Sequence, residues 1–251
     1  MTQYLYKYYP IVEYALENLK NEEICFNTMS AFEDKNEGHF VMESKTTDSY
    51  NLAEKLANRV GNDISDKIIF LYRILCLTRS KDQEYMWNNY AGDKTGFCIE
   101  YERENLKSIS SIMREMTYES KKIPNSYFED SLDRNKFERE IDNVLFKKGI
   151  GYKKENETRI INRVYNDMII EVGRKEYLDQ KWNANSLNEY FEEFFTKKYF
   201  KAPKRIMEKC IPHKIYLGPN ILKNDEEQIR AIIQGRQYNV EKLEPNELRT
   251  I

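Results

Sequence analysis

The chain has 251 residues, of which 40% are hydrophobic, and this is enough to bury one substantial core. No stretch rich in proline, glycine and serine divides the sequence, so we expect a single domain over residues 1–251. Forty basic and forty-two acidic residues give a formal net charge of −2. This balance excludes a general electrostatic attraction to nucleic acid or to an anionic membrane, although it leaves room for a local basic patch.

The N-terminal stretch MTQYLYKYYP lacks a charged leader followed by a long apolar region, and no run of about 18 apolar residues occurs. We therefore expect a cytoplasmic protein with no membrane partner.

Helical and strand-like patterns follow one another without a fixed period, and the mixture predicts an α+β fold. Apolar residues three and four apart indicate helices, and short runs rich in Ile, Val, Phe and Tyr indicate strands. We expect strands at 6–8, 23–28, 67–80, 95–102 and 213–219, and helices at 9–23, 48–61, 83–92, 134–149, 185–200 and 224–238. The run over 67–80 is also long enough for a helix that breaks near Arg73. The last helix has Asn224 or Asp225 as its expected cap.

Cysteines and histidines limit the chemistry that the chain can support. The cysteines are widely spaced in apolar or mixed runs and show no zinc-binding spacing, which predicts buried thiols in a reducing compartment and no metal site on them: Cys25, Cys76, Cys98 and Cys210. His39 and His213 both lie in polar or loop-like surroundings. We expect both to be ordinary surface histidines.

The stretch YKKENETRII, residues 152–161, places two carboxylates two positions apart. On a helix, such residues point about 200° apart, whereas on a strand they share a face. The Thr and Ile content that follows favours a strand over 152–163, with alternate side chains on one face: Lys153, Glu155, Glu157 and Arg159. Two interpretations stay open, a solvated edge of alternating charges or a pair of acids directed at one substrate.

Several motifs appear in a fixed order along nearly the whole chain: YKY (6–8), FEDKNE (32–37), CLT (76–78), MWNNYA (86–91), GFCIEY (96–101), YKKENETR (152–159) and LGP (217–219). In this order they resemble the bacterial domain-of-unknown-function family 2971. The sequence departs from the family pattern at Glu33 and Lys35, which replace an Asn and a Pro, and at Tyr152, which replaces a Trp.

The motif order is similar to that of ADP-ribosyltransferases, in which two small sheets form a cleft for NAD. The corresponding elements are the strand 6–8, Thr78 with Ser80, and the Glu155-x-Glu157 pair. The resemblance implies transfer of ADP-ribose from this dinucleotide to a macromolecular acceptor, protein or nucleic acid, and a role as a bacterial defence or toxin effector.

The residue types suit that reaction. Cleavage of the nicotinamide–ribose bond builds positive charge on the sugar, and a fixed carboxylate opposes such charge. Glu157 is expected to hold the ribose and oppose this charge, and Glu155 to orient or deprotonate the acceptor. The pyrophosphate would pair with Lys7, Arg79 or Arg159. Three tyrosines would offer flat surfaces to the bases: Tyr6, Tyr8 and Tyr90.

Each of these residues also has a purely structural interpretation. Tyr6, Tyr8 and Thr78 suit any strand, and the Trp87–Tyr90 spacing is common in helix packing. Arg159 could pair with Glu155 or Glu157 in an ion-pair ladder.

Two other functional classes remain open. The basic, aromatic stretches FKKGIGYKK (146–154) and TKKYFKAPKR (196–205) are compatible with a nucleic-acid-binding or nuclease module. Such a module could hold a divalent cation on four acids: Asp34, Glu37, Glu155 and Glu157. A partner-binding module rich in tyrosine is the third class. Salt-dependent binding of DNA or RNA would favour the second class, and binding of NAD the first.

Overall fold

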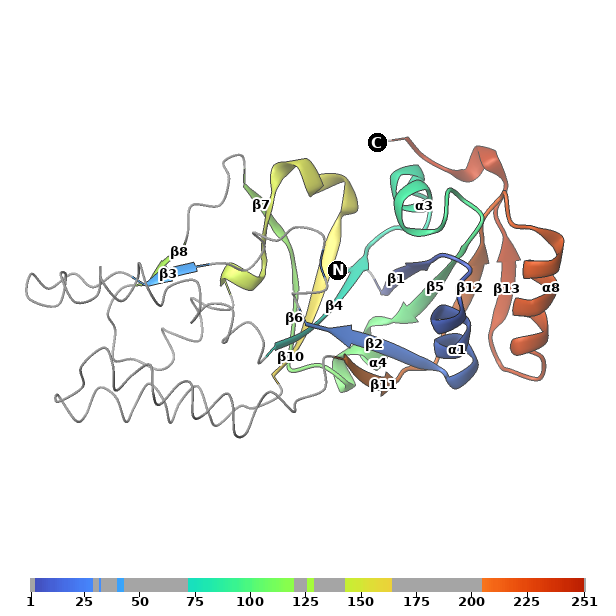
Figure 1. The fold of residues 1–251 in the computed structure, drawn as a ribbon, viewed down its shortest axis with the longest axis horizontal. Helices are drawn as coiled ribbons and strands as arrows, with labels where there is room; N and C mark the ends of the chain where they lie inside the picture. Colours follow the sequence, from blue (N-terminus) through green and yellow to red (C-terminus); the bar gives the residue numbers. More distant parts are fainter. Residues whose placement is uncertain are drawn as a thin grey trace, which may run out of the picture.

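The structure, a computed structural model, describes residues 3–28, 32, 40–42, 72–119, 126–128, 143–163 and 205–250. Within these residues a nine-stranded sheet dominates (Figure 1). Its strands are β1 (Tyr4–Tyr9), β2 (Glu23–Asn27), β4 (Tyr72–Thr78), β5 (Phe97–Glu102), β6 (Ile112–Glu115), β10 (Glu157–Arg163), β11 (Arg205–Lys209), β12 (Lys214–Leu217) and β13 (Asn239–Lys242). All neighbours are antiparallel except the parallel pair β12 and β13.

Shorter elements surround this sheet. They include the helices α1 (Glu13–Asn21), α3 (Glu84–Tyr90), α4 (Arg103–Ser108) and α8 (Lys223–Ile232), with 3₁₀ turns η2 (Ile150–Glu155) and η4 (Pro245–Glu247). Two small parallel pairs join β3 (Phe40–Met42) to β8 (Ser126–Phe128), and β7 (Thr117–Glu119) to β9 (Lys147–Gly149). The mixture of helices with a mostly antiparallel sheet confirms the α+β class.

The sheet divides at β4. One edge of β4 pairs with β10 along its whole length. The other edge pairs with β2 at Ile74 and with β1 at Thr78, so β1 and β2 separate on either side of Cys76. Two arms result, β1–β5–β12–β13 and β2–β11 (Figure 1). At the division, Lys7 Nζ donates a hydrogen bond of 2.9 Å to the Cys76 carbonyl, which satisfies a polar group that has no strand neighbour there.

The main core combines apolar residues from both arms with those of α1 and α8. It includes Leu5 and Ile99 from one arm, Phe26 from the other, and Leu19 and Ile229 from the helices. The alternation of buried and half-buried residues along β2 explains how a five-residue strand contributes to this core while its other face stays polar. Burial of these side chains supplies the main favourable term for the fold.

A second core lies on the other face of the first arm, beneath α3. Trp87 is fully buried there and packs edge-on against Tyr8, with ring centroids 5.0 Å apart. The Trp87 indole N–H donates to the Lys81 carbonyl at 2.8 Å, so its polar edge is satisfied. The structural interpretation therefore holds for Trp87, and α3 is fixed by it on the sheet.

Two motif glycines are required by close backbone packing. A Cβ at Gly96 would overlap the Tyr9 carbonyl oxygen, and a Cβ at Gly218 would overlap that of Lys94. The two glycines also contact each other, because Gly218 N–H donates to the Gly96 carbonyl at 2.9 Å. The glycines of the GFCIEY and LGP motifs therefore join α3, β5 and β12 rather than contribute chemistry.

Most of the predicted elements that fall on described residues are confirmed. The strand at 6–8 is part of β1, and those at 23–28, 95–102 and 213–219 contain β2, β5 and β12; the helices at 9–23, 83–92 and 224–238 contain α1, α3 and α8. The described part of the run over 67–80 is strand β4, with no helical break near Arg73. The predicted helices at 48–61 and 185–200 lie outside the described residues, as does His39.

Three predicted details are wrong. The helix expected over 134–149 ends before Lys147, because residues 147–149 pair with β7 as strand β9. Helix α8 begins at Lys223 with Leu222 as its N-cap, so neither Asn224 nor Asp225 is the cap. Residues 150–155 form η2, so the strand expected from 152 begins only at Glu157.

All four cysteines are free. Among the described residues, no helix is both long and apolar enough to cross a membrane.

Candidate functional site

The ENE stretch is a turn between two elements. Glu155 is the last residue of η2, Asn156 has left-handed backbone angles of φ 49° and ψ 45°, and Glu157 begins β10. Asparagine is one of the few residues that adopts this conformation readily. The expectation that Lys153 and Glu155 share a strand face with Glu157 is therefore wrong, because the turn interrupts the alternation before the strand begins.

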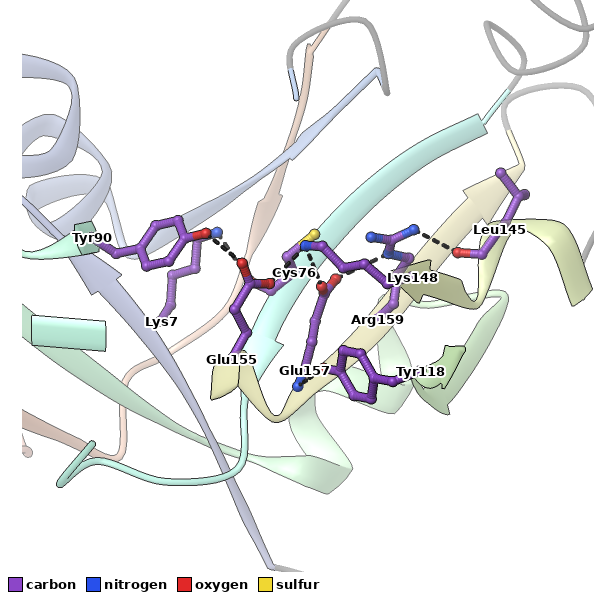
Figure 2. A network of polar contacts seen from close by, with 9 residues as sticks. All are labelled: Lys7, Cys76, Tyr90, Tyr118, Leu145, Lys148, Glu155, Glu157 and Arg159. Atoms are coloured by element: carbon purple, nitrogen blue, oxygen red, sulfur yellow. Dashed lines mark hydrogen bonds and ion pairs between the residues drawn. The ribbon is translucent and has the colours of Figure 1, made fainter. Parts of the chain in front are cut away.

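The two carboxylates nevertheless converge on one cation. Lys148 Nζ, from β9, lies 2.6 Å from Glu155 Oε2 and 3.1 Å from Glu157 Oε2 (Figure 2). Both glutamates are nearly inaccessible, with exposed fractions of 4% and 3%. Lys148 also lies 4.8 Å from the centre of the Tyr152 ring. Pairing at this depth is what permits two carboxylates to stay buried side by side.

Arg159 is the second cation of the network. It lies two residues after Glu157 on β10, and its Nε donates to Glu157 Oε1 at 3.0 Å. Its Nη1 donates to the Leu145 carbonyl at 2.5 Å, and its guanidinium faces the Phe32 ring. Because Arg159 is fully buried, its observed role is to balance Glu157. In this arrangement it does not present donors to a pyrophosphate.

The environment moves the pKa values of the two carboxyls in opposite directions. Burial opposes ionisation of Glu157, but the charges of Arg159 and Lys148 outweigh burial and lower its pKa from 4.5 to about 2. Burial raises the pKa of Glu155, and the Lys148 charge offsets this only in part. One carboxylate is thus held ionised, and its neighbour is the more easily protonated of the two. In many catalytic carboxyl pairs, the pKa values of the two groups are shifted apart in this way.

Two tyrosines contact the two glutamates, Tyr90 at the carboxylate of Glu155 and Tyr118 at the backbone of Glu157. The Tyr90 hydroxyl, from α3, donates to Glu155 Oε1 at 2.7 Å. The Glu157 backbone N–H donates to the Tyr118 hydroxyl of β7 at 2.8 Å. Burial raises the pKa of Tyr118 to about 12, so it stays a neutral phenol. With 38% of its surface exposed, Tyr90 is the member of this network nearest to solvent.

Three residues from different motifs lie in one row across neighbouring strands. Glu157 is the register partner of Thr78, which is in turn the partner of Tyr6. Directly paired residues of antiparallel strands share a face. Tyr6, Thr78 and Glu157, one residue from each of the YKY, CLT and ENE motifs, are therefore adjacent on one face of the sheet.

The other candidate residues occupy less accessible positions. Thr78 is buried, with its Oγ1 3.5 Å from Gln83 Oε1. Tyr8 is buried in the second core, and its hydroxyl donates to the Ser80 carbonyl at 2.9 Å. Lys7 lies on the opposite face from Tyr6, at the division of the sheet. Thr78, Tyr8 and Lys7 therefore each contribute to packing or hydrogen bonding within the fold.

Arg79 is the accessible arginine beside the ENE turn. It follows β4 directly, and 29% of its side chain is exposed. Its Nη2 donates to the Asn156 side-chain oxygen and its Nη1 pairs with Glu115. Its Nε is buried and has no partner among the described residues. Of the arginines considered for a phosphate group, Arg79 rather than Arg159 is placed to meet one.

Sequence reasoning missed three members of this site: Lys148, Asn156 and Tyr118. Lys148 was hidden in the basic run FKKGIGYKK, which resembles a solvated helix end. The available signal was the pair of glycines at 149 and 151, which argues against a continuing helix. No local signal places β9 beside the ENE turn, because that contact depends on the path of the whole chain.

The nucleic-acid interpretation loses part of its basis. In the run 146–154, Lys148 is buried on the two glutamates and Lys147 pairs with Glu119 at 3.0 Å, whereas Lys153 and Lys154 are exposed. The second basic stretch lies outside the described residues except for Arg205. Asp34 and Glu37 are also outside them, and the described residues contain no cluster of metal-ligating side chains.

Comparison with known proteins identifies one family. The family described as "Protein of unknown function (DUF2971)" matches residues 86–247, about two thirds of the chain. The matched range contains the MWNNYA, GFCIEY, ENE and LGP motifs, and it confirms the resemblance that these motifs indicated. Neither the curated proteins nor the solved structures contain a significant match.

Proposed function

The chain belongs to the DUF2971 family, and we propose that it is an enzyme that cleaves NAD at the nicotinamide–ribose bond and transfers ADP-ribose to an acceptor. One observation carries the proposal. Two carboxylates separated by a single residue share one lysine, while their pKa values are shifted in opposite directions. Active sites concentrate such perturbed groups, because catalysis needs one group ionised and another able to exchange protons.

In this proposal Glu157 acts as the ionised carboxylate. Departure of nicotinamide leaves positive charge on the ribose carbon, and a carboxylate fixed in a water-poor site opposes that charge without having to reorient. Arg159 and Lys148 keep Glu157 ionised and in place. Lys148 lies closer to Glu155 than to Glu157, so Glu157 retains the weaker of the two lysine contacts.

Glu155 acts as the base for the acceptor. The bond between the ribose carbon and nicotinamide breaks, and its electron pair leaves with nicotinamide. A new bond forms from the acceptor oxygen or nitrogen to the same carbon, and the acceptor proton passes to Glu155. A raised pKa suits this step, since it brings the carboxyl closer to the pH at which proton transfer is most effective.

The accessible residues around the carboxylates fit the remainder of the substrate. Tyr6 and Ser80 are half-buried and Tyr90 is exposed, so they can contact a ring or a ribose. Arg79 offers a guanidinium next to Asn156 for the pyrophosphate. Because both carboxylates are nearly inaccessible, the ribose approaches them on the side of Tyr90, the exposed member of the network.

The test is nicotinamide release and transfer of label from NAD, measured in parallel on the wild type and on glutamine variants. Glu157→Gln should lower both rates by about 10²- to 10³-fold, because it removes the charge but little volume. Glu155→Gln should lower transfer while slow hydrolysis by water persists. The matched control is Glu119→Gln, which removes a partly exposed carboxylate from a neighbouring strand.

The wild type must release nicotinamide for the proposal to stand. Equal rates in the wild type and Glu157→Gln, with both proteins folded at the assay temperature, would assign the glutamate pair to structure alone. Absence of any thermal stabilisation by NAD at millimolar concentration would weigh against it in the same way, since a ligand at 100 times its dissociation constant adds about 2.7 kcal/mol.

A further inference from the structure

The row of paired residues that contains Glu157, Thr78 and Tyr6 continues across the sheet to Glu100 and Lys214. Tyr6 is the register partner of Glu100 on β5, which is the partner of Lys214 on β12. All these side chains therefore project from one face of the sheet. Neighbouring strands are about 4.8 Å apart, so Glu100 lies three strands, or about 14 Å, from Glu157 along the row.

Glu100 is a buried carboxylate whose hydrogen-bonding capacity is only partly used. It is 5% exposed, and the Tyr216 hydroxyl donates to its Oε2 at 3.0 Å. The Tyr6 hydroxyl also interacts with it, and after burial this neighbouring carboxylate is the main reason why the pKa of Tyr6 is raised. Its Oε1 has His213 Nε2 at 3.7 Å, beyond hydrogen-bond distance. An ionised carboxylate accepts up to about four hydrogen bonds, so Glu100 retains sites for a ligand's donors.

Two lysines lie over the ring of Tyr216, the tyrosine that donates to Glu100, and an exposed imidazole lies beside the carboxylate itself. Lys81 Nζ lies 4.7 Å from the centre of the Tyr216 ring, and Lys214 Nζ lies 5.0 Å from it. Lys214 is paired with Glu241, whereas Lys81 makes no ion pair within the described part of the chain. The His213 side chain is 41% exposed and stacks on Tyr4. Solvent reaches the two half-buried lysines and the exposed imidazole, whereas Glu100 and Tyr216 are buried.

This combination matches the parts of a nucleotide. A carboxylate is the usual acceptor for ribose hydroxyls in dinucleotide sites, an aromatic side chain suits a base, and a lysine without a carboxylate partner suits a phosphate. We propose that Glu100, Tyr6 and Lys81 form a nucleotide subsite that holds the adenosine phosphate end of the dinucleotide, with Glu100 on the ribose hydroxyls and Lys81 on the phosphate. The assignment to NAD rests on the proposed function, but nucleotide binding at this place does not.

The experiment combines three ligands with two variants in isothermal titration calorimetry. AMP, 2′,3′-dideoxy-AMP and adenosine are used because none of them carries nicotinamide, so no turnover is needed. The wild type should bind AMP about 10- to 100-fold more tightly than the dideoxy compound, since hydrogen bonds to a charged group are lost. Glu100→Gln should remove most of that discrimination. Lys81→Gln should weaken AMP but leave adenosine unchanged.

The matched control is Glu102→Gln. Glu102 lies on the same strand and face as Glu100, but its side chain is 41% exposed and it pairs with His213 rather than with the tyrosines. It should change every affinity by less than twofold. If Glu100→Gln fails to fold, the Lys81→Gln comparison of AMP with adenosine still decides the question. AMP that fails to bind at millimolar concentration, or variants that discriminate as the wild type does, would overturn the subsite.

The two proposals fail separately. Loss of AMP discrimination in Glu100→Gln, together with no NAD cleavage by the wild type, would leave a nucleotide site without the proposed reaction. If the wild type cleaves NAD normally but substitutions at Glu100 and Lys81 do not change AMP binding, the proposed reaction stands and the proposed subsite is wrong.

Discussion

Glu155 and Glu157 reach the same lysine from two different elements, with Lys148 Nζ 2.6 Å from one carboxylate and 3.1 Å from the other. The single left-handed residue between them turns the chain from η2 into β10. Two buried carboxylates this close stay ionised together only when positive charge is held between them. Lys148 and Arg159 supply that charge, so the four side chains form a balanced unit that is sensitive to the loss of any one member.

Removal of the shared cation should destabilise the fold. Lys148→Met keeps a flexible side chain but leaves two buried carboxylates against one arginine, and we expect the free energy of unfolding to fall by about 3–5 kcal/mol. Urea denaturation at neutral pH measures this. Lys147→Met is the matched control, because its ion pair with Glu119 is about one third exposed and should contribute less than about 1 kcal/mol. Equal losses in the two variants would contradict the balanced unit.

The lowered pKa of Glu157 predicts a specific loss of stability in acid. The folded pKa of about 2 lies below the unfolded value of 4.5. Its contribution is therefore fully present above pH 4.5 and is lost as the pH falls towards 2, by about 3 kcal/mol. The stability difference between wild type and Glu157→Gln should shrink by this amount between pH 5 and pH 2. Parallel curves for the two proteins over that range would show that Glu157 has an ordinary pKa.

Glu155 should act with the opposite sign. Its pKa is raised in the folded protein, so its stabilising contribution is fully present below the unfolded pKa and is lost as the pH rises through the folded one. Glu155→Gln should therefore gain stability relative to the wild type as the pH is raised above about 4.5, which is the unfolded value. Urea denaturation from pH 4 to pH 8 measures this, and a difference that does not change with pH would contradict it.

Backbone conformation at Asn156 should matter more than its side chain. Asn156→Gly keeps the left-handed angles accessible, whereas Asn156→Val must adopt them at a cost of about 1–2 kcal/mol or move the two glutamates. Both variants lose the contact from Arg79, so the comparison isolates the backbone. Urea denaturation should show Asn156→Val as the less stable of the pair. Equal stability would mean that the turn relaxes without strain.

The hydrophobic pattern of the sequence predicted most of the helices and strands around the site. Apolar residues at helical spacing predicted α1, and the apolar run over 67–80 favoured a strand, of which Tyr72–Thr78 is β4. Tyr6, Thr78 and Glu157 each lie in a motif that was expected to be a strand, and the strand register places the three side by side. The local sequence pattern was thus sufficient to predict that these segments are strands.

The composition of the site could not be predicted in the same way. Alternate charges at 153, 155, 157 and 159 have the period of a strand, but a left-handed residue at 156 interrupts it, and period alone contains no sign of that turn. Lys148 is seven residues before Glu155 and lies on a separate small sheet. Its burial depends on the tertiary path, so a lysine in a basic run looked like a solvated one.

Tyr90 should position Glu155 and set its titration. The Tyr90 hydroxyl donates to Glu155 Oε1 at 2.7 Å, and this hydrogen bond favours the ionised carboxylate. Tyr90→Phe removes the donor, so the pKa of Glu155 should rise further. Since Glu155 must be ionised to accept a proton, the rising limb of kcat/KM against pH for NAD should move to higher pH by the same amount.

A carbon-13 NMR titration of the Glu155 side chain measures that shift without any turnover. The control is Tyr14→Phe, which alters an exposed tyrosine of α1 and should leave both the titration and the pH profile unchanged. A lower kcat in Tyr90→Phe with an unmoved limb and an unmoved titration would mean that Tyr90 only packs beside the site. A titration that moves while the rate profile does not would instead remove Glu155 from the proton transfer, because the group whose pKa changed would then not be the base.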